Sequence, residues 1–133
     1  MEYRVFLIED VEATRALLRL LLGDTAYRVV GEASTLFTAL QKLPTTPADI
    51  VVLDLQMPDG NGIDVVPRIR ELYPDMVIVV ASAQNDANSV QSALQMGAQG
   101  YLIKPFTPGA LENTLGRALR RAGRVVPVVQ QDH

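Results

Sequence analysis

Reactive side chains follow the apolar segments of this chain at four places. In chain order they are Glu9, Asp10, Asp54, Ser82 and Lys104. Three carboxylates held together repel one another, and a divalent cation such as Mg2+ or Mn2+ relieves that repulsion by binding their oxygens. The central carboxylate, Asp54, would then be a nucleophile for phosphorus and would form an acyl phosphate. Because Lys104 and Ser82 could bind phosphoryl oxygens, the pattern predicts phosphoryl transfer to a carboxylate.

These residues can act together only if the apolar segments bring them to one edge. Five segments are predicted to be strands, over residues 3–8, 27–32, 49–54, 76–81 and 100–103. Amphipathic segments between them predict helices over residues 11–23, about 35–42, up to about 72, 86–96 and from 107 onward. Nearly unbroken Val, Ile and Leu strands are typical of a parallel sheet covered on both faces. Such sheets bind ligands at the carboxyl ends of their strands, where the reactive residues lie.

Finer features of the helices also follow from the residue pattern. The first helix is expected to bury a face formed by Ala13, Leu17, Leu20 and Leu21. Side-chain caps are predicted for three later helices at Ser34, at Asn85 or Asp86, and at Thr107. Gly97 is expected to end the helix of residues 86–96.

Composition limits the classes of protein that fit this chain. Its 133 residues suit one domain, predicted over residues 1–122, with residues 123–133 as a linker or C-terminal tail. The net charge of -3 argues against direct nucleic acid binding by this domain. Cysteines are absent and the single histidine is His133, so disulfides and thiolate or multi-histidine metal sites are excluded. No apolar run approaches about 20 residues and no signal peptide pattern is present, so we expect a cytoplasmic protein without a membrane segment.

Four motifs together resemble one protein family. They are Glu9-Asp10, VVLDLQMPDGNG around Asp54, VVASA with Ser82, and GAQGYLIKP with Lys104-Pro105. In this order, and each at a predicted strand end, they are similar to the receiver domain of bacterial two-component response regulators. The similarity runs from about residue 3 to residue 122. It implies a flavodoxin-like (βα)5 doubly wound α/β fold, with a five-stranded parallel sheet in the order 2-1-3-4-5.

The resemblance assigns the phosphoacceptor and metal-binding roles. Asp54 matches the phosphorylated aspartate, and Mg2+ would be bound by Asp10, Asp54 and the backbone carbonyl of Gln56. Glu9 matches a neighbouring acid that usually acts through water. The acidic pair of the family is most often two aspartates, so Glu9 is a departure from its pattern. Gln56 and Gln84 flank the path of the attacking water and are expected to tune dephosphorylation.

The resemblance also assigns switch residues. Ser82 matches the hydroxyl that turns toward the phosphoryl group, and Tyr101 matches the aromatic residue that turns inward behind it. Lys104 matches the phosphate-binding lysine, and its bond to Pro105 is expected to be cis. The resemblance implies no enzyme activity beyond Mg-dependent self-phosphorylation and autodephosphorylation.

Partners follow from the same resemblance. It implies a sensor histidine kinase as the phosphoryl donor and a homodimer through the fourth helix, fifth strand and fifth helix. The chain would be the N-terminal part of a DNA-binding transcriptional regulator or a stand-alone single-domain regulator. A phosphorylation-independent interaction module is a further alternative; the full set of site residues argues against it, but the departure at Glu9 leaves it open.

Ordinary structural roles compete with each assignment. Glu9 and Asp10 could cap the first helix, and Asp54 could belong to a turn. Lys104 could be a solvated surface residue, and Tyr101 a half-buried strand aromatic. The placement of all these residues at one sheet edge favours the functional interpretation over these separate roles.

Two enzyme classes fit the sequence less well. A haloacid-dehalogenase-like phosphatase also uses a strand-end aspartate, but it needs a second aspartate two positions later, where this chain has Gln56. A nucleotide-binding α/β domain needs a glycine-rich phosphate loop, and none follows the first predicted strand.

Overall fold

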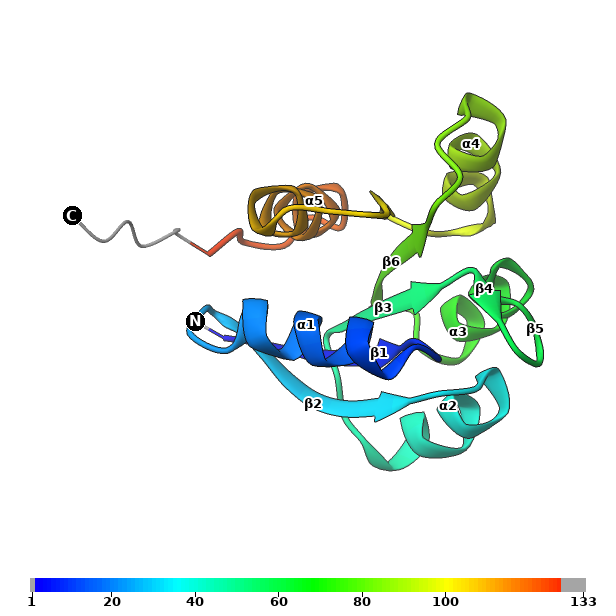
Figure 1. Cartoon of the computed structure of the whole chain (residues 1–133), viewed down its shortest axis with the longest axis horizontal. Coiled ribbons are helices and arrows are strands. Elements are labelled where there is room, and N and C mark those ends of the chain that lie inside the picture. Colours follow the sequence, from blue (N-terminus) through cyan, green and yellow to red (C-terminus); the bar gives the residue numbers. More distant parts are fainter. Residues whose placement is uncertain (1, 128–133) are drawn as a thin grey trace.

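The five predicted strands form one parallel sheet in the computed structural model, which describes residues 2–127 (Figure 1). They are β1 (Tyr3–Ile8), β2 (Tyr27–Ala33), β3 (Ile50–Asp54), β6 (Val77–Ser82) and β7 (Gly100–Ile103). Their order across the sheet is β2-β1-β3-β6-β7, which confirms the predicted 2-1-3-4-5 order of the long strands. The strands β3 and β6 are buried along their whole length, because helices cover the sheet on both sides.

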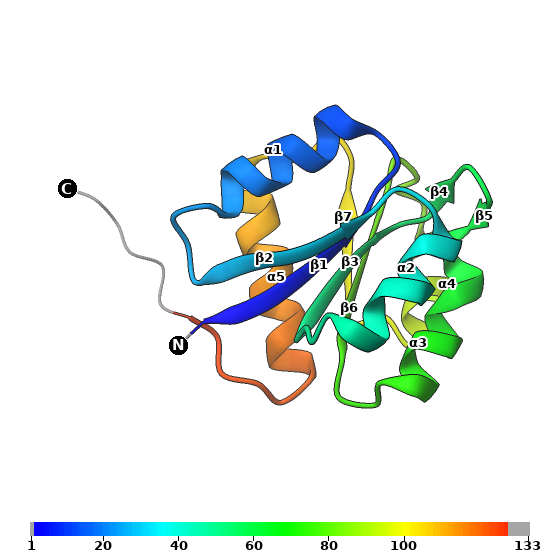
Figure 2. The same cartoon turned by 90° about the horizontal axis from the view of Figure 1, so that it is seen from below.

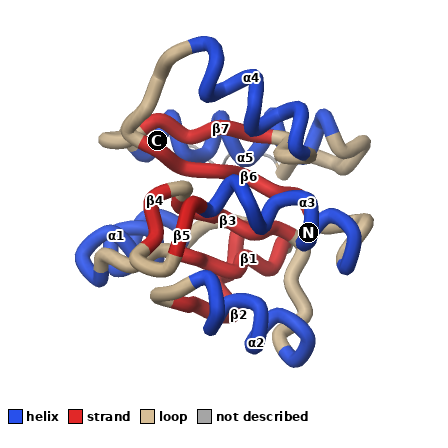
Figure 3. The backbone as a smooth tube through the Cα atoms, turned by 90° about the vertical axis from the view of Figure 1, so that its right-hand side faces the viewer, coloured by secondary structure: helices blue, strands red, loops and turns tan. Residues whose placement is uncertain are grey.

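Two layers of helices enclose this sheet (Figures 2 and 3). One face carries α1 (Glu12–Leu22) and α5 (Pro108–Arg121). The other face carries α2 (Leu36–Lys42), α3 (Val66–Leu72) and α4 (Ala87–Met96). The result is the doubly wound α/β fold that the resemblance implies. Among residues 2–127, no helix is long and apolar enough to cross a membrane.

Short elements fill the connections on either side of β3. A 3-10 helix, Leu43–Thr45, lies before this strand. The loop predicted after it contains a hairpin, β4 (Gln56–Met57) and β5 (Gly60–Asn61), and then a second 3-10 helix, Gly62–Val65. Pro67 lies in the first turn of α3, where its missing amide proton costs no helical hydrogen bond.

The buried face of α1 differs from the predicted one. Ala13, Leu17 and Leu20 are exposed, and Leu20 has 76% of its surface accessible. Leu18 and Leu22 are buried instead, and Leu21 is partly buried against them. The prediction was therefore wrong for three of its four residues. Leucines occupy most positions in the second half of α1 and therefore lie on all sides of the helix. Their spacing alone fits more than one inward face.

Side-chain caps fix where the other helices begin. The cap of α2 is Thr35, whose hydroxyl accepts a hydrogen bond from the Thr38 amide at 3.0 Å, so the prediction of Ser34 was wrong by one residue. Asp86 caps α4 and Thr107 caps α5, as predicted. Gly97 ends α4 with a φ of 118°, a backbone conformation that favours glycine.

The chain after α5 lies against the amino-terminal edge of the sheet. The Arg124 guanidinium stands 5.6 Å from the centre of the Tyr3 ring and 3.8 Å from Asp49 Oδ1. The Tyr3 hydroxyl donates a hydrogen bond to the Val125 carbonyl, and Val126 packs against the core beneath α5. Residues 128–133 of the expected linker or tail lie outside the described residues.

Candidate functional site

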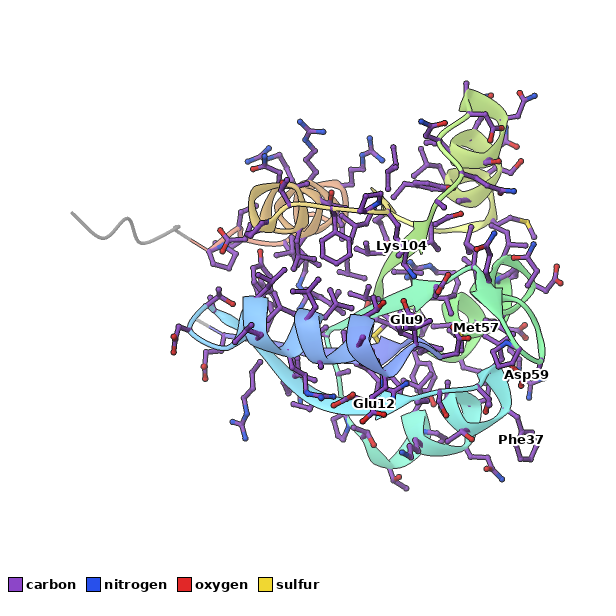
Figure 4. The ribbon with its side chains drawn as sticks, in the orientation of Figure 1. Glu9, Glu12, Phe37, Met57, Asp59 and Lys104 are labelled. Atoms are coloured by element: carbon purple, nitrogen blue, oxygen red, sulfur yellow. The ribbon has the colours of Figure 1, made fainter. Side chains whose placement is uncertain are left out.

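The sheet brings the predicted reactive residues to its carboxyl edge. Glu9 follows β1, and Asp54 ends the neighbouring strand β3. Asp54 pairs in register with Ala81, which places it beside the end of β6 and next to Ser82. Lys104 follows β7 on the far side of β6. Figure 4 shows Glu9 and Lys104 at this same end of the sheet.

Three carboxylates converge at this edge. One oxygen each from Glu9, Asp10 and Asp54 lies within 4.8 Å of the others. Glu9 and Asp54 are buried, and Asp10 is exposed. The Gln56 amide donates a hydrogen bond to Asp54 Oδ1 at 2.9 Å, so the backbone of Gln56 also lies beside the cluster. An all-oxygen set with one solvent-facing carboxylate fits a hard divalent cation that keeps some of its water.

Lys104 supplies the positive charge at this cluster. Its ammonium donates hydrogen bonds to Glu9 Oε1 and, at 2.8 Å, to Asp54 Oδ2. The Lys104 side chain is only 22% exposed, so it is not the solvated surface lysine of the alternative interpretation. Its backbone amide bonds to the Ser82 carbonyl at 2.8 Å, and the Lys104–Pro105 peptide bond is cis. The lysine is therefore held by both its backbone and its side chain.

Burial and charge shift two pKa values at this edge. Burial, together with the nearby Asp54 carboxylate, raises the pKa of the Glu9 carboxyl to about 7, although the Lys104 hydrogen bond opposes both effects. Burial alone would lower the pKa of Lys104. Hydrogen bonds to Asp54 and Glu9 outweigh that effect, so its pKa is raised and its ammonium stays charged.

Glu9 also lies at the start of α1, as the capping alternative suggested. Its Oε2 accepts a hydrogen bond from the Val11 amide at 3.2 Å. The N-cap position itself is Val11, which makes no side-chain cap. Because the other oxygen of Glu9 bonds Lys104, one side chain serves both the helix start and the charged cluster.

Ser82, Gln84 and Tyr101 form a connected group beside the cluster. The Ser82 hydroxyl, which is buried, accepts a hydrogen bond from the Gln84 amide at 3.1 Å. The Tyr101 hydroxyl donates to the Gln84 carbonyl at 2.8 Å. The peptide groups on either side of Gln84 therefore connect the end of β6 with an aromatic side chain of β7.

The loop after Asp54 is held in place by two features. A Cβ atom at Gly62 would lie 2.4 Å from the Asp54 carbonyl oxygen, so only glycine fits this position. The Asp59 carboxylate accepts hydrogen bonds from the Leu36 and Phe37 amides at 2.9 and 3.0 Å, at the start of α2 (Figure 4). Sequence reasoning missed Asp59, because its helix lies more than 20 residues earlier and no local spacing indicates the contact.

The comparisons with known proteins identify the family. A family model described as the response regulator receiver domain matches residues 5–116. The chain belongs to this family. It is 32% identical over 117 residues to the chemotaxis protein CheY of Thermotoga maritima, a match that covers 88% of this chain and 98% of that protein. It is 38% identical to the KDP operon transcriptional regulatory protein KdpE of Escherichia coli, over 88% of this chain but 51% of that protein.

Solved receiver domains share the fold. The beryllofluoride-activated NtrC4 receiver domain dimer superposes with a TM-score of 0.81 at 29% identity, over 90% of this chain and 98% of that chain. As a receiver domain, the chain is a two-component signalling module and not a catalytic enzyme. Receiver domains pair with histidine kinases, and the Glu9, Asp10 and Asp54 cluster has the composition typical of a magnesium site in this family.

Proposed function

We propose that this receiver domain accepts a phosphoryl group on Asp54 from a sensor histidine kinase and thereby switches an output surface. The observation that carries the proposal is the buried Asp54 carboxylate, which lies within 4.8 Å of two further carboxylates and accepts a hydrogen bond from the Lys104 ammonium. A carboxylate held in this way is directed and paired with positive charge, and phosphoryl transfer requires mainly positioning and charge neutralisation.

Mg2+, or Mn2+ in its place, would be held by Asp10, Asp54 and the backbone carbonyl of Gln56, with Glu9 acting through water. When bound, the cation would supply positive charge that neutralises the phosphoryl oxygens. An oxygen of Asp54 forms the new P–O bond, while the P–N bond to the kinase histidine breaks and its imidazole leaves. Lys104 already bonds Asp54, so its ammonium needs only a short shift to reach a phosphoryl oxygen.

The added phosphoryl group would change the contacts around Gln84. A Ser82 hydroxyl that turns to a phosphoryl oxygen gives up its bond with the Gln84 amide. Tyr101, which bonds the Gln84 carbonyl, follows the loop and turns inward as the switch residue. Gln56 and Gln84 flank the aspartyl phosphate and set the rate of its hydrolysis.

The output surface consists of α4, β7 and α5, through which we propose that two copies form a homodimer. Met96 and Ile103 are exposed on it, and α5 adds the exposed residues Arg117, Arg120 and Arg121. In this proposal residues 1–122 form the cytoplasmic receiver domain, and residues 123–133 are a linker or C-terminal tail whose first residues pack against that domain. Because the match covers 51% of KdpE, a named transcriptional regulator, we favour the N-terminal part of a DNA-binding regulator over a stand-alone one.

Trapping the adduct tests the proposal. We expect purified protein to gain one phosphoryl mass with acetyl phosphate and magnesium, and to bind fluoroberyllate under the same conditions. Asp54→Asn should gain neither, because it lacks the nucleophile, while Asp64→Asn serves as a matched control at an exposed acid of the next helical segment. Intact-mass spectrometry measures the product. An equal adduct on Asp54→Asn would contradict the assignment of the phosphoacceptor.

One observation supports a phosphorylation-independent interaction module as the second candidate. Lys104 bonds both Glu9 and Asp54, so part of the carboxylate repulsion is already relieved without a cation. The same mass measurement separates the candidates, because an interaction module gives no adduct on the wild-type chain.

A further inference from the structure

An arginine outside the predicted site contacts the backbone of the β1–α1 loop. Arg15 lies near the start of α1, and its Nη1 donates a hydrogen bond to the Glu9 carbonyl at 2.6 Å. Its side chain is 16% exposed. The contact therefore joins a nearly buried cation to the peptide group between Glu9 and Asp10, the two acids of the loop.

That peptide group controls where both acids point. A peptide unit is planar, so fixing the Glu9 carbonyl also fixes the plane that leads to the Cα atom of Asp10. The Glu9 carboxylate is held separately, by Lys104 and by the Val11 amide. Arg15 thus supplies a backbone restraint on the loop that the side-chain contacts of Glu9 do not supply.

Glu32, on the neighbouring strand β2, orients this arginine. Its Oε1 accepts a hydrogen bond from Arg15 Nε at 3.2 Å and also bonds Arg19, one turn further along α1. The Lys42 ammonium bonds the Glu32 carbonyl at 2.9 Å. The guanidinium of Arg15 is therefore held at both ends, by Glu32 on one side and by the Glu9 carbonyl on the other.

We propose that Arg15 is a positioning residue for cation binding, which holds the β1–α1 loop so that Asp10 and Glu9 present their carboxylates to the divalent ion. This inference rests on the proposed function. Groups that orient metal ligands without touching the metal contribute about 10- to 100-fold to affinity, so the loss of Arg15 should weaken magnesium binding by at least about tenfold.

The charge of Arg15 and its positioning of the loop predict opposite changes in magnesium affinity when Arg15 is neutralised. The direction of the measured change therefore distinguishes the two effects. Arg15 is a cation close to a site for another cation, and its repulsion alone would weaken magnesium binding. If charge dominated, neutralising Arg15 would tighten binding. If positioning dominates, neutralising Arg15 loosens binding, and Arg15→Lys, which keeps the charge and one donor group, recovers part of the loss.

Arg19 provides the matched control. It shares the Glu32 carboxylate with Arg15, but its side chain is 43% exposed and its bond goes to Glu32 and not to the loop. Arg15→Gln and Arg19→Gln both remove one positive charge and one ion pair with Glu32 from α1. A change seen only in Arg15→Gln therefore reports the contact with the Glu9 carbonyl.

Magnesium affinity by titration calorimetry and amide hydrogen exchange of the metal-free protein test the inference. We expect Arg15→Gln to bind magnesium at least about tenfold more weakly and to exchange the amides of residues 9–11 faster. Arg19→Gln should match the wild type in both measurements. Magnesium binding by Arg15→Gln that is equal to or tighter than wild type would overturn the inference.

Magnesium and fluoroberyllate binding by the wild type, together with amide exchange in the variants, separate this inference from the proposed function. A wild-type chain that binds neither magnesium nor fluoroberyllate overturns the proposed function and, with it, the role of Arg15 in cation binding. A wild type that binds both, with equal loop exchange in Arg15→Gln and Arg19→Gln, overturns the inference alone.

Discussion

Lys104 and Glu9 show how a largely buried acidic cluster is stabilised by an ion pair within the protein itself. Glu9 is 3% exposed, and the Lys104 ammonium that bonds its carboxylate also bonds Asp54. Buried carboxylates are costly unless they are paired, and each ion pair here offsets the desolvation of its acid. Lys104 therefore has two roles, one in the stability of the resting fold and one in the proposed binding of phosphate.

Replacing this lysine should destabilise the metal-free protein. In Lys104→Met, Glu9 and Asp54 stay buried without their partner, and we expect the free energy of unfolding to fall by about 3 kcal/mol. Magnesium should remove much of the loss, because its charge replaces that of the ammonium. Urea unfolding with and without magnesium measures both values, and an equal loss in the two conditions would contradict this account.

Sequence alone identified the charged residues of the site but missed the residues that orient them. Asp54 and Lys104 could be found because the ends of parallel strands meet at one edge. Arg15 could not, because helical spacing shows which residues share a face but does not show that a long side chain turns back to a backbone carbonyl. Such contacts depend on the exact start of the helix, which sequence patterns fix only to within a few residues.

Asp59, in the turn between β4 and β5, links this hairpin to the start of α2. Its two hydrogen bonds come from the first amides of α2, which have no partners within the helix. These backbone hydrogen bonds hold the pKa of Asp59 below its ordinary value. The carboxylate thus fixes the loop after Asp54 against the start of a helix from earlier in the chain.

This link should depend on pH. Since the folded-state pKa of Asp59 lies below its unfolded value of 3.8, its contribution to stability is present above pH 3.8 and is lost as pH falls through the folded value. We expect Asp59→Asn to be less stable than wild type at pH 6 and equally stable once both forms are neutral in strong acid. Thermal unfolding across this range, with Asp64→Asn as the control, measures the difference. A difference that persists unchanged in acid would exclude the carboxylate charge as its cause.

The helices also show where sequence patterns reach their limit. The face of α5 follows from one apolar stripe of the sequence, whose residues Leu111, Leu115, Ala118 and Leu119 are all buried. The run of leucines in α1 offers several stripes, and packing against the sheet selects Leu18 and Leu22. Propensity and spacing therefore locate both helices, whereas only tertiary contacts decide the rotation of α1 about its axis.

The molecule as a whole separates two charged regions at opposite edges of one sheet. The acidic cluster occupies the carboxyl edge, and Arg124, Asp49 and Tyr3 meet at the amino edge. We expect Arg124→Ala to lower the free energy of unfolding by about 1 kcal/mol, through loss of its ion pair and its contact with the Tyr3 ring. Adduct formation on Asp54 should be unchanged.

Arg120→Ala is the control for that change, because Arg120 is an exposed arginine near the end of α5, shortly before Arg124 in the chain. It removes the same charge and should leave stability unaltered. Urea unfolding of the two variants gives the comparison. Equal values would show that the contacts of Arg124 at the amino edge add nothing to the fold.

The bond between the Tyr3 hydroxyl and the Val125 carbonyl has a practical consequence for handling the protein. It keeps the start of β1 and the last described residues together, at the end of the sheet opposite the carboxyl end of β3 (Figure 2). A fluorescent reporter or a surface tether attached beside Tyr3 or Val125 would thus leave the carboxyl edge of the sheet, where we propose phosphorylation, open to a kinase. Immobilised or labelled protein should therefore report phosphoryl transfer without steric blocking.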